Sequence, residues 1–456
     1  MLCAFKDAIR SVSRSCLYRL VAIAALVFVG ASALSAATLC VSKNKKSGCY
    51  TTIGAAVTAA SPGDVIQVTR GTYAEMVTIT KSLSLVAFDG ERPVIDATGL
   101  ANGIFVNGMS AAPMSGVANV LISGFAIRNA NFEGILVANA SDVTLVGNHV
   151  SDNDKALDIA DGACPGIDTD FETNEGEDCG EGIHLIAVRH SSVVRNESDH
   201  NSGGLLITDE TGVSEDNLIT GNDVHDNPFD CGITLASHGQ ATAIIPAATL
   251  PYGVRHNTIA GNISAHNGYE VPGAGAGVGI FAPFPGTTDA DNVVIGNELR
   301  NNGLPGVTLH NHASAPAPAP PVNMNGNVIV HNHISGNGKD TEDAATSGPT
   351  GVNLFSTAPV YGTVVSQNSF DDESIDVAYN APKGQLDAHF NDFSIGIGVD
   401  EIGAAPVNAT ENWWHCPAGP GAKPHCATVT GASVAVAPWL TSPFAPEGNP
   451  WTGTLR

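Results

Sequence analysis

The sequence predicts an all-β solenoid, a single-stranded parallel β-helix built from repeated coils of short strands. A turn rich in asparagine recurs along the chain, for example as "GNHVSDN" (147–153), "GNDVHDN" (221–227) and "GNELRNN" (296–302). Such a turn is followed by a glycine and a short alternating strand, as in "GIHLIAV" (182–188) and "GITLASH" (232–238). A supersecondary unit that returns at a near-constant period is the sequence signature of a solenoid.

The segments between the turns favour strands over helices. Their apolar residues alternate in runs of four to six, bounded by Gly, Asn and Asp. No helix-length amphipathic segment lies between them, which excludes leucine-rich and helical repeats. Three short strands per coil would stack about 4.8 Å apart, so that like residues form vertical files. A β-sandwich or barrel is the alternative, but neither repeats the turn, the glycine and the strand in a fixed order.

The corner asparagines are predicted to belong to the scaffold. Asparagine tolerates the left-handed backbone of tight turns, and it can bond to the asparagine of the coil above or below. We therefore expect Asn222, Asn227 and Gly232 to be structural, with Ile233 and Leu235 pointing inward.

Two intervals predict a period of 22 residues, from Gly134 to Ala156 and from Gly182 to Gly204. This period places "ALDIADG" (156–162) as a rung of its own. Longer intervals are expected to carry inserts that wall one face of the stack.

The first 37 residues have the pattern of a secretory signal peptide, and residues 38–456 are expected to form one domain. Four basic residues precede the apolar stretch "LVAIAALVFVGASALSAA", which ends in small residues. An uncleaved membrane anchor is the alternative. We expect a secreted or periplasmic protein that does not contact the membrane after cleavage.

The segment that opens the β-helix, "TTIGAAVTAASPGDVIQVTRGTYAEMVTITKSLSLVAFDGERPVID", resembles the first coil of right-handed parallel β-helix proteins of the pectin lyase-like superfamily. In those proteins an amphipathic helix caps the stack. A helix over 51–61 is also predicted from the residues themselves, because Ile53, Ala56 and Val57 share a face and Pro62–Gly63 ends it.

The other end, "NWWHCPAGPG…VAPWL" (412–440), resembles the last coil of NosD-like periplasmic β-helix proteins. We expect Trp413, Trp414 and Trp439, with a disulfide, to cap this end, because an open stack would polymerise. The superfamily includes pectate, pectin and alginate lyases, polysaccharide hydrolases, epimerases and non-enzymatic members. The resemblance therefore implies a right-handed fold and leaves the activity open.

Six cysteines outside the leader lie in three close pairs. Close pairs in an exported protein predict disulfides that clip short loops, each contributing about 2–3 kcal/mol. Zinc is the alternative, but no CxxC motif is present. Cys231, beside Gly232, is predicted to be a buried apolar side chain and not a nucleophile. The predicted disulfides are Cys40–Cys49, Cys164–Cys179 and Cys416–Cys426.

The chain is acidic, with 20 Lys and Arg against 45 Asp and Glu and a formal net charge of −25. Such a surface repels nucleic acids and anionic membranes. It would also repel a polyuronate unless a divalent cation bridged the two. We expect a polysaccharide partner, no nucleic acid partner, and a monomer.

Counting along the strands brings titratable side chains onto one outer face. Asp158 and His184 are predicted neighbours on adjacent rungs, about 5 Å apart. Glu210 is predicted to precede His238 in a second file. The remaining members of this face are Thr208, Asp209, Phe281, His310, His312 and Phe355.

This set suits a saccharide groove. Asp209 or Glu210 is a candidate acid or nucleophile, and His238, or the Asp158–His184 pair, is a candidate base. Thr208, Phe281, His310, His312 and Phe355 are candidate substrate contacts. The alternative is that exposed strand faces carry polar residues without any function.

The insert at 168–181 is dense in carboxylates, and Asp168, Asp170 and Glu172 are candidate Ca²⁺ ligands. It lacks the spacing of a calcium-binding loop, so a solvated acidic loop is the alternative. "HNH" occurs at 310–312 and 331–333, and such a pair could hold copper or zinc. The sequence requires no cofactor.

Two functions stay open. The first is an exported β-helix protein that binds, and cleaves or modifies, a polysaccharide on one lateral face, as a hydrolase, lyase or epimerase. The second is a non-catalytic NosD-like periplasmic or surface protein that handles metal. Whether the protein is an enzyme is not decided by the sequence.

Overall fold

The chain divides into two compact units, Met1–Ala37 and Thr38–Arg456. The computed structural model describes residues 36–44, 47–109, 116–168, 172, 178–239, 252–270, 275–311, 321–341 and 344–444. The predicted signal peptide at 1–37 therefore lies almost wholly outside the described residues. Within the described part, no helix is long and apolar enough to cross a membrane.

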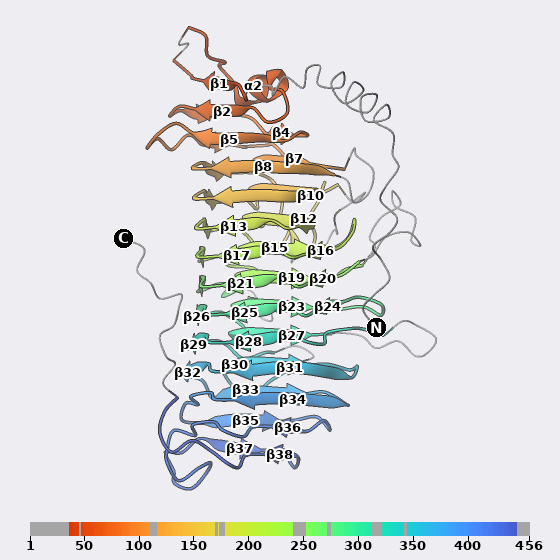
Figure 1. The fold of residues 1–456 in the computed structure, drawn as a ribbon, viewed down its shortest axis with the longest axis vertical. Helices are drawn as coiled ribbons and strands as arrows, with labels where there is room; N and C mark the ends of the chain where they lie inside the picture. The colour runs from red at the N-terminus through yellow and green to blue at the C-terminus, as the bar shows by residue number, and fades with distance from the viewer. Residues whose placement is uncertain are drawn as a thin grey trace, which may run out of the picture. The chain divides into compact units, whose positions relative to one another are not determined.

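The second unit is a stack of coils in which nearly every strand pairs in parallel with the strand one coil away (Figure 1). The strands fall into three main columns, which we name by their first and last strands, and the last coils contribute no strand to the third column. The predicted parallel β-helix is confirmed.

The β4–β37 column continues through half of β10. It consists of β4 (Val77–Ile79), β7 (Ile104–Asn107), β10 (Ile135–Val146), β12 (Ile183–Arg189), β15 (Leu205–Thr208), β19 (Ile233–Ala236), β23 (Val278–Phe281), β27 (Val307–His310), β30 (Thr350–Phe355), β33 (Ile375–Asn380), β35 (Ile397–Glu401) and β37 (Thr428–Thr430).

The β1–β38 column takes the other half of β10. It consists of β1 (Thr38–Val41), β2 (Val65–Val68), β5 (Leu83–Ala87), β8 (Val117–Ser123), β13 (Ser192–Val194), β17 (Leu218–Thr220), β21 (Thr258–Ala260), β25 (Val293–Ile295), β28 (Val328–Val330), β31 (Val360–Ser366), β34 (Gly384–His389), β36 (Val407–Asn408) and β38 (Val434–Ala435). A short file continues from the end of β12 through β16 (Ser214–Glu215), β20 (Val254–Arg255) and β24 (Asp289–Ala290).

The β3–β32 column is a separate ten-stranded sheet. It consists of β3 (Thr72–Tyr73), β6 (Val94–Asp96), β9 (Ala126–Arg128), β11 (His149–Ser151), β14 (Glu197–Asp199), β18 (Asp223–His225), β22 (Ile263–Ala265), β26 (Glu298–Arg300), β29 (His333–Ser335) and β32 (Ser369–Asp371).

The interior of the stack is filled by the inward side chain of each alternating pair. Ile233 and Leu235 of β19 are both fully buried, as predicted. Gly232 precedes them at a point where coils approach closely, because a Cβ there would clash with Ser264 Oγ and Asn267 Nδ2. Cys231 is a free, buried cysteine, also as predicted, and burial raises the pKa of its thiol well above the usual range.

Asparagine ladders hold the corners of successive coils. The backbone N–H and the side-chain Nδ2 of Asn222 both donate to Oδ1 of Asn262, each at 2.9 Å. Asn227 donates in the same two ways to Asn267, at 3.3 and 2.9 Å. Each such asparagine is buried, so these bonds satisfy groups that would otherwise be desolvated without a partner. The predicted scaffold role of Asn222 and Asn227 is confirmed.

The ladder through Asn227 ends on a carboxylate. Asn337 donates its backbone N–H and its Nδ2 to Oε1 of Glu373, at 3.1 and 2.9 Å. Oε2 of Glu373 is buried and has no hydrogen-bond partner. Burial, only partly offset by the Asn337 bonds, raises the pKa of Glu373 to about 7.

Glu373→Gln is therefore expected to stabilise the protein at pH 8 and to change little at pH 4.5. Because the pKa of Glu373 is higher in the folded state than in the unfolded state, the folded protein binds this proton more tightly. The resulting contribution to folding stability is fully present below about pH 4.5 and is lost as the pH rises through about 7. The loss at pH 8 is about 3 kcal/mol, and glutamine removes it while keeping the acceptor oxygen. Chemical unfolding at both pH values measures the difference. Asp291→Asn, at an exposed corner, is the matched control, and an equal response of both variants would contradict the prediction.

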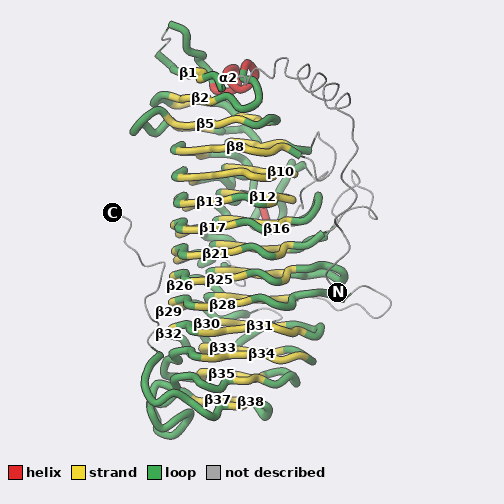
Figure 2. Tube along the Cα trace, in the orientation of Figure 1, coloured by secondary structure: helices red, strands yellow, loops and turns green. Residues whose placement is uncertain are grey.

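The predicted helical cap is present at the first coil of the stack (Figure 2). At the first coil, helix α2 (Ile53–Ala59) buries Ile53, Ala56 and Val57. It is N-capped by Thr52, and both oxygens of Glu75 accept its first N–H groups at 2.8 Å.

The last coil encloses a tryptophan. Trp414 is fully buried, and its ring lies 4.8 Å from that of Phe393 between centroids. Trp439 is 37% exposed and donates from Nε1 to the carbonyl of Pro417. The three predicted disulfides are confirmed, as Cys40–Cys49, Cys164–Cys179 and Cys416–Cys426.

The predicted rung at 156–162 is wrong. Leu136 of β10 pairs directly with His184 of β12, and His184 pairs with Leu206 of β15. Asp158 lies instead in the insert between β11 and β12, where it forms an antiparallel bridge with Ala163. The step from Gly182 to Gly204 has the expected length, since Ile183 pairs with Leu205.

Candidate functional site

The outward side of the β4–β37 column is covered along β12, β15 and β19. His184 is 2% exposed and Thr208 0%, although an open groove was expected there. The insert between β11 and β12 contributes to the cover, since Glu172 lies within 4.8 Å of His184 and Asp178 lies 3.1 Å from His238. Polar side chains that the pleat directs outward are thus enclosed, and the prediction of an open groove at these rungs is wrong.

The enclosed side chains form what we call the carboxylate–histidine centre. Seven carboxyl groups and two histidines contribute to it from adjacent coils and from the loops beside them. All the carboxyl groups are buried. The members are Glu133, Glu172, Asp178, Glu181, His184, Asp209, Glu210, Asp230 and His238.

His238 lies between two carboxylates. Its Nδ1 is 2.7 Å from Oε1 of Glu210, and its Nε2 is 3.1 Å from Oδ2 of Asp178. Burial alone would raise the pKa of Glu210, but the hydrogen bond and the charge of His238 bring that pKa below its ordinary value. Glu210 is therefore ionised near neutral pH. Its second oxygen, Oε2, is buried and has no hydrogen-bond partner.

Three hydrogen bonds fix the position of the Asp209 carboxylate. Ser237 Oγ donates to it at 2.7 Å, and the N–H groups of Gly239 and Gly253 donate at 3.0 and 2.7 Å. Burial and the neighbouring charge of Glu210 raise the pKa of Asp209 to about 6. Because both oxygens are occupied, Asp209 fixes the loop ends at 239 and 253 and is a positioning residue.

Glu181 sits in a group of three carboxyls. One oxygen each of Asp178, Glu181 and Asp230 lies within 4.8 Å of the other two. Burial, followed by the charge of Asp178, raises the pKa of Glu181 well above its ordinary range. Both oxygens of Glu181 are buried without a hydrogen-bond partner. Glu181 therefore keeps its proton to a higher pH than an ordinary glutamate does.

A second group of three surrounds His184. Ligand atoms of Glu133, Glu172 and His184 lie within 4.8 Å of one another. The Nε2 of His184 is 3.0 Å from Thr208 Oγ1, and its Nδ1 is 4.0 Å from Oε1 of Glu133. Burial, and then the charge of Glu133, raises the pKa of Glu172 well above its ordinary value.

The structure brings together most of the predicted catalytic residues. His184, Asp209, Glu210 and His238 all belong to the centre, and Thr208 contacts it through His184. Asp158 does not pair with His184, because the segment that resembles a rung is part of an insert. The predicted Asp158–His184 pair is therefore wrong.

The predicted substrate contacts form a file beside the centre. Ala236 of β19 pairs with Phe281, Phe281 with His310, and His310 with Phe355. The His310 ring lies edge-on between the two phenylalanines, with centroids 5.8 and 6.3 Å away. Both phenylalanines are partly exposed, whereas His310 is buried against Asp340. His312 lies outside the described residues.

Two of the three predicted calcium ligands lie in the described part of the chain, and the charge of Asp168 contributes to the raised pKa of Glu172. Asp168 is exposed and Glu172 is buried in the centre, while Asp170 lies outside the part of the chain that is described. A calcium site at these three residues therefore stays a prediction.

Glu133 and Asp230 were missed from the sequence, and Asp178 and Glu181 were noted only among the carboxylates of the insert at 168–181. A signal for two of them was present, because Glu133 and Glu181 occupy the same slot, directly before the glycine that opens a strand. Their stacking is visible in the backbone, where the N–H of Gly134 donates to the carbonyl of Glu181. The later coils carry Gly203 and Cys231 at this position, which are uncharged. A glutamate repeated there in two coils could therefore have identified Glu133 and Glu181 as unusual.

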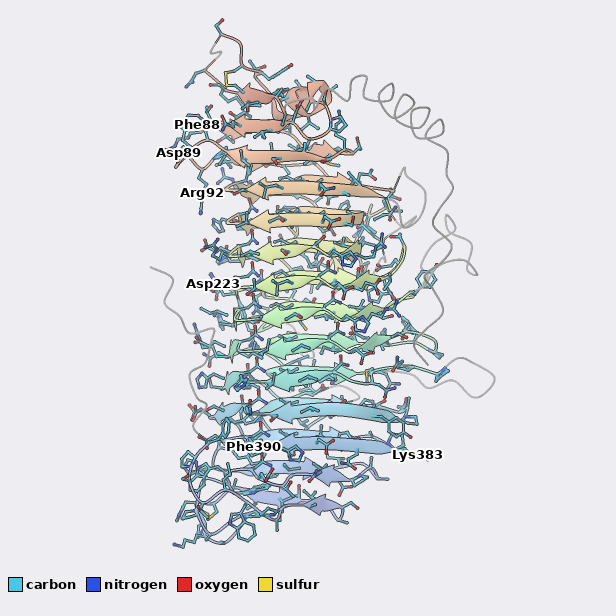
Figure 3. The ribbon with its side chains drawn as sticks, viewed as in Figure 1. Phe88, Asp89, Arg92, Asp223, Lys383 and Phe390 are labelled. Carbon is cyan, nitrogen blue, oxygen red and sulfur yellow. A yellow bond between two sulfur atoms is a disulfide. The ribbon has the colours of Figure 1, made fainter. Side chains whose placement is uncertain are left out.

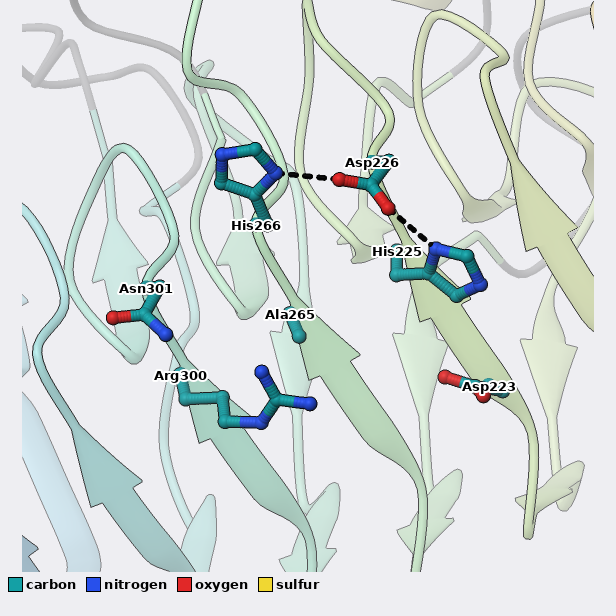
Figure 4. A pocket seen from close by; sticks show the side chains of 7 residues that line it. All are labelled: Asp223, His225, Asp226, Ala265, His266, Arg300 and Asn301. Atoms are coloured by element: carbon teal, nitrogen blue, oxygen red, sulfur yellow. Dashed lines mark hydrogen bonds and ion pairs between the residues drawn. The ribbon is translucent and has the colours of Figure 1, made fainter.

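A separate open pocket of about 700 Å³ lies on the β3–β32 column (Figure 4). Asp226 there contacts both His225 and His266, and Arg300 lines the opposite side. Asp223, exposed on the side of the stack (Figure 3), completes the rim. In this pocket Asp226 is hydrogen-bonded to both histidines, whereas several carboxylate oxygens of the centre have no hydrogen-bond partner.

Residues 65–246 match the family model described as a right handed beta helix region. This match agrees with the observed stack of parallel coils, so the fold is a right-handed parallel β-helix. No sequence match was found among curated proteins.

Several solved structures are similar at low identity. An alginate lyase from Paenibacillus sp. str. FPU-7 is 13% identical, with a TM-score of 0.45, over 70% of this chain and 94% of the lyase. The Dettilon tailspike protein is 12% identical, with a TM-score of 0.47, over 82% of this chain and 62% of the tailspike. A DFA-IIIase from Arthrobacter chlorophenolicus A6, in complex with DFA-III, is 14% identical, with a TM-score of 0.44, over 77% and 94%.

Proposed function

We propose that this protein is an enzyme that hydrolyses a polysaccharide at the carboxylate–histidine centre. One observation carries the proposal: the surroundings drive the pKa values of Glu181 and Glu210 in opposite directions. Two carboxyls of one site whose pKa values are shifted apart can supply the acid and the base or nucleophile that glycoside cleavage needs.

The contacts suggest separate roles. Glu181 is the proposed general acid, because burial raises its pKa and neither of its oxygens has a hydrogen-bond partner. Glu210 is the proposed base or nucleophile, since His238 holds Oε1 and leaves Oε2 unpaired. Asp178 joins the two, because it contacts His238 and lies in the same group as Glu181. At the edge of the centre, the Asp178 and His238 side chains remain 9% and 6% exposed.

The charge of the centre favours hydrolysis of a neutral glycan over elimination on a polyuronate. Elimination requires that the uronate carboxylate be neutralised, yet the centre has seven carboxyls against two histidines. The whole chain, at −25, would add to the repulsion of a polyanion.

A linear polymer fits the file of Phe281, His310 and Phe355. These residues occupy one register position on successive rungs, which repeat about every 4.8 Å. The partly exposed phenylalanine rings offer apolar platforms to sugar rings along the stack axis. Phe281, the first residue of the file, pairs with Ala236 of the preceding rung. Ala236 lies two residues before His238 in the sequence, so a bound glycan chain would run toward the centre.

We further propose that the protein is exported. The leader pattern at 1–37 supports this, and the three disulfides suit an oxidising compartment.

A glycan panel tests the proposed function. The purified protein is incubated with neutral glucans, fructans and mannans, and with polyuronates in the presence and absence of Ca²⁺. New reducing ends are expected from a neutral member without unsaturated uronates, and Glu181→Gln is expected to lower the rate by about 10²–10⁴-fold. Unsaturated products from a uronate would indicate a lyase and contradict the proposed hydrolysis. No product from any member would favour the non-catalytic alternative.

A further inference from the structure

We infer that Glu133, Glu172 and His184 form a binding site for a first-row divalent transition metal ion, of the Zn²⁺ or Mn²⁺ class. The inference does not depend on the proposed hydrolysis. Its geometric basis is that one ligand atom of each residue lies within 4.8 Å of those of the other two. For a single ion to bind all three residues, their ligand atoms would need to move only slightly closer together.

The three donors reach the site from different parts of the chain. Glu133 directly precedes the strand glycine Gly134, and His184 lies on β12 in the next coil, so the stacking of β10 on β12 brings them together. Glu172 comes from the insert between β11 and β12, which the Cys164–Cys179 disulfide closes.

The buried donors lack partners, which is an observation independent of the clustering. Glu133 is 0% exposed, and neither of its carboxylate oxygens has a hydrogen-bond partner. Oε2 of Glu172 and Nδ1 of His184 are likewise buried without one. Buried carboxylates that face each other without hydrogen bonds are strongly unfavourable, and a bound cation would remove that penalty.

The surroundings hold the donors in place. The N–H of Glu133 donates to Asn102 Oδ1 at 3.1 Å, and its carbonyl accepts from Gly103 at 3.1 Å. Thr208 Oγ1 is 3.0 Å from Nε2 of His184, so the other ring nitrogen faces Glu133. A hydrogen bond on the far nitrogen of a histidine is the usual support for a metal ligand, since it fixes the tautomer and the ring orientation.

The donor set selects the kind of ion. Ca²⁺ and Mg²⁺ prefer oxygen ligands alone, whereas imidazole with carboxylates suits Zn²⁺ and related ions. The group of Asp178, Glu181 and Asp230 contains only oxygen donors, and Asp178 is already engaged by His238. It therefore carries no such inference.

Calorimetric titration of the full-length protein, stripped with a chelator, tests the inference. We expect one strong site for Zn²⁺ or Mn²⁺, and much weaker binding of Ca²⁺. Glu133→Gln and, separately, Glu172→Gln are expected to weaken the strong site at least tenfold. Glutamine keeps the size of the side chain and removes its charge, and Glu172 lies on an insert, so at least one of the two variants should fold normally.

Glu197→Gln is the matched control. Glu197 belongs to a partly exposed group with His149 and Asp199, in which those two already contact each other at 2.6 Å. This variant should bind as the unaltered protein does. A Co²⁺ absorption band that disappears in His184→Ala would identify the nitrogen ligand.

Two results would overturn the inference: no strong binding of either ion by the unaltered protein, or binding that neither Glu133→Gln nor Glu172→Gln weakens. Binding is measured without a glycan, so failure of the proposed hydrolysis would leave this outcome unaffected.

Discussion

Glu210→Gln is expected to lower kcat by about 10²–10⁴-fold on the glycan that the protein hydrolyses. The substitution removes the charge that His238 holds in place, while the amide oxygen can still accept the 2.7 Å hydrogen bond from Nδ1. The side chain keeps its shape in a fully buried position, so the fold should be preserved. Steady-state rates, measured beside the circular dichroism spectrum and the thermal midpoint of the same preparation, give the result.

Glu215→Gln is the matched control for that substitution. Glu215 lies five residues further along the same coil and is not part of the centre. Its Oε2 accepts from Arg255 Nε at 3.0 Å. This variant should keep its kcat within about twofold, since surface ion pairs contribute little. Equal rates for the two variants would remove Glu210 from the proposed chemistry, even if the glycan panel had given a product.

Asn262→Asp is expected to lower the free energy of unfolding by about 3–5 kcal/mol. In the ladder, Asn262 Nδ2 donates to the carbonyl of Ile219 at 3.0 Å and to Oδ1 of Asn297 at 2.9 Å. An aspartate side chain can still accept from Asn222, but it has no N–H to donate, so its second oxygen would face the two acceptors that Asn262 Nδ2 now bonds. A buried carboxylate without a compensating charge adds to that repulsion. The shift of the denaturant midpoint at pH 8 measures the effect.

Asn301→Asp tests whether position in the ladder is what matters. Asn301 is exposed at a corner, with φ of 55°, a backbone conformation that asparagine and aspartate both tolerate. Its replacement should change stability by less than about 0.5 kcal/mol. If both variants lose the same stability, the ladder bonds do not account for the loss at Asn262.

The repeated parts of the architecture were predictable from sequence, because their information is local. A turn asparagine, a glycine and an alternating strand recur together, and the pleat alone assigns Ile233 and Leu235 to the interior. The asparagines that the pattern marked as scaffold do bond from coil to coil, as Asn222 does to Asn262. The cap helix and the three disulfides were predictable for the same reason, since each depends on residues close together in the chain.

The register across an insert was not predictable. The stretch at 156–162 alternates like a strand, and local pattern gives no reason to exclude it from the stack. The ladder excludes it, because Asn153 donates directly to Asn201, which places β11 of one coil beside β14 of the next. Asp158 was assigned to the wrong neighbour because the register depends on which corner amides meet, and these lie far apart in the chain.

The sequence by itself determined the coil, its corners and its inward and outward sides, since periodicity encodes each of them. Only the tertiary structure decided that the outward side is enclosed at β12, β15 and β19, and that Glu133 and Glu181 join Glu210 and His238 there. Burial and charge coupling depend on what the inserts cover and on which coils are adjacent. Those two conditions shift the pKa values of neighbouring carboxyls in opposite directions, and neither condition is a property of any single segment.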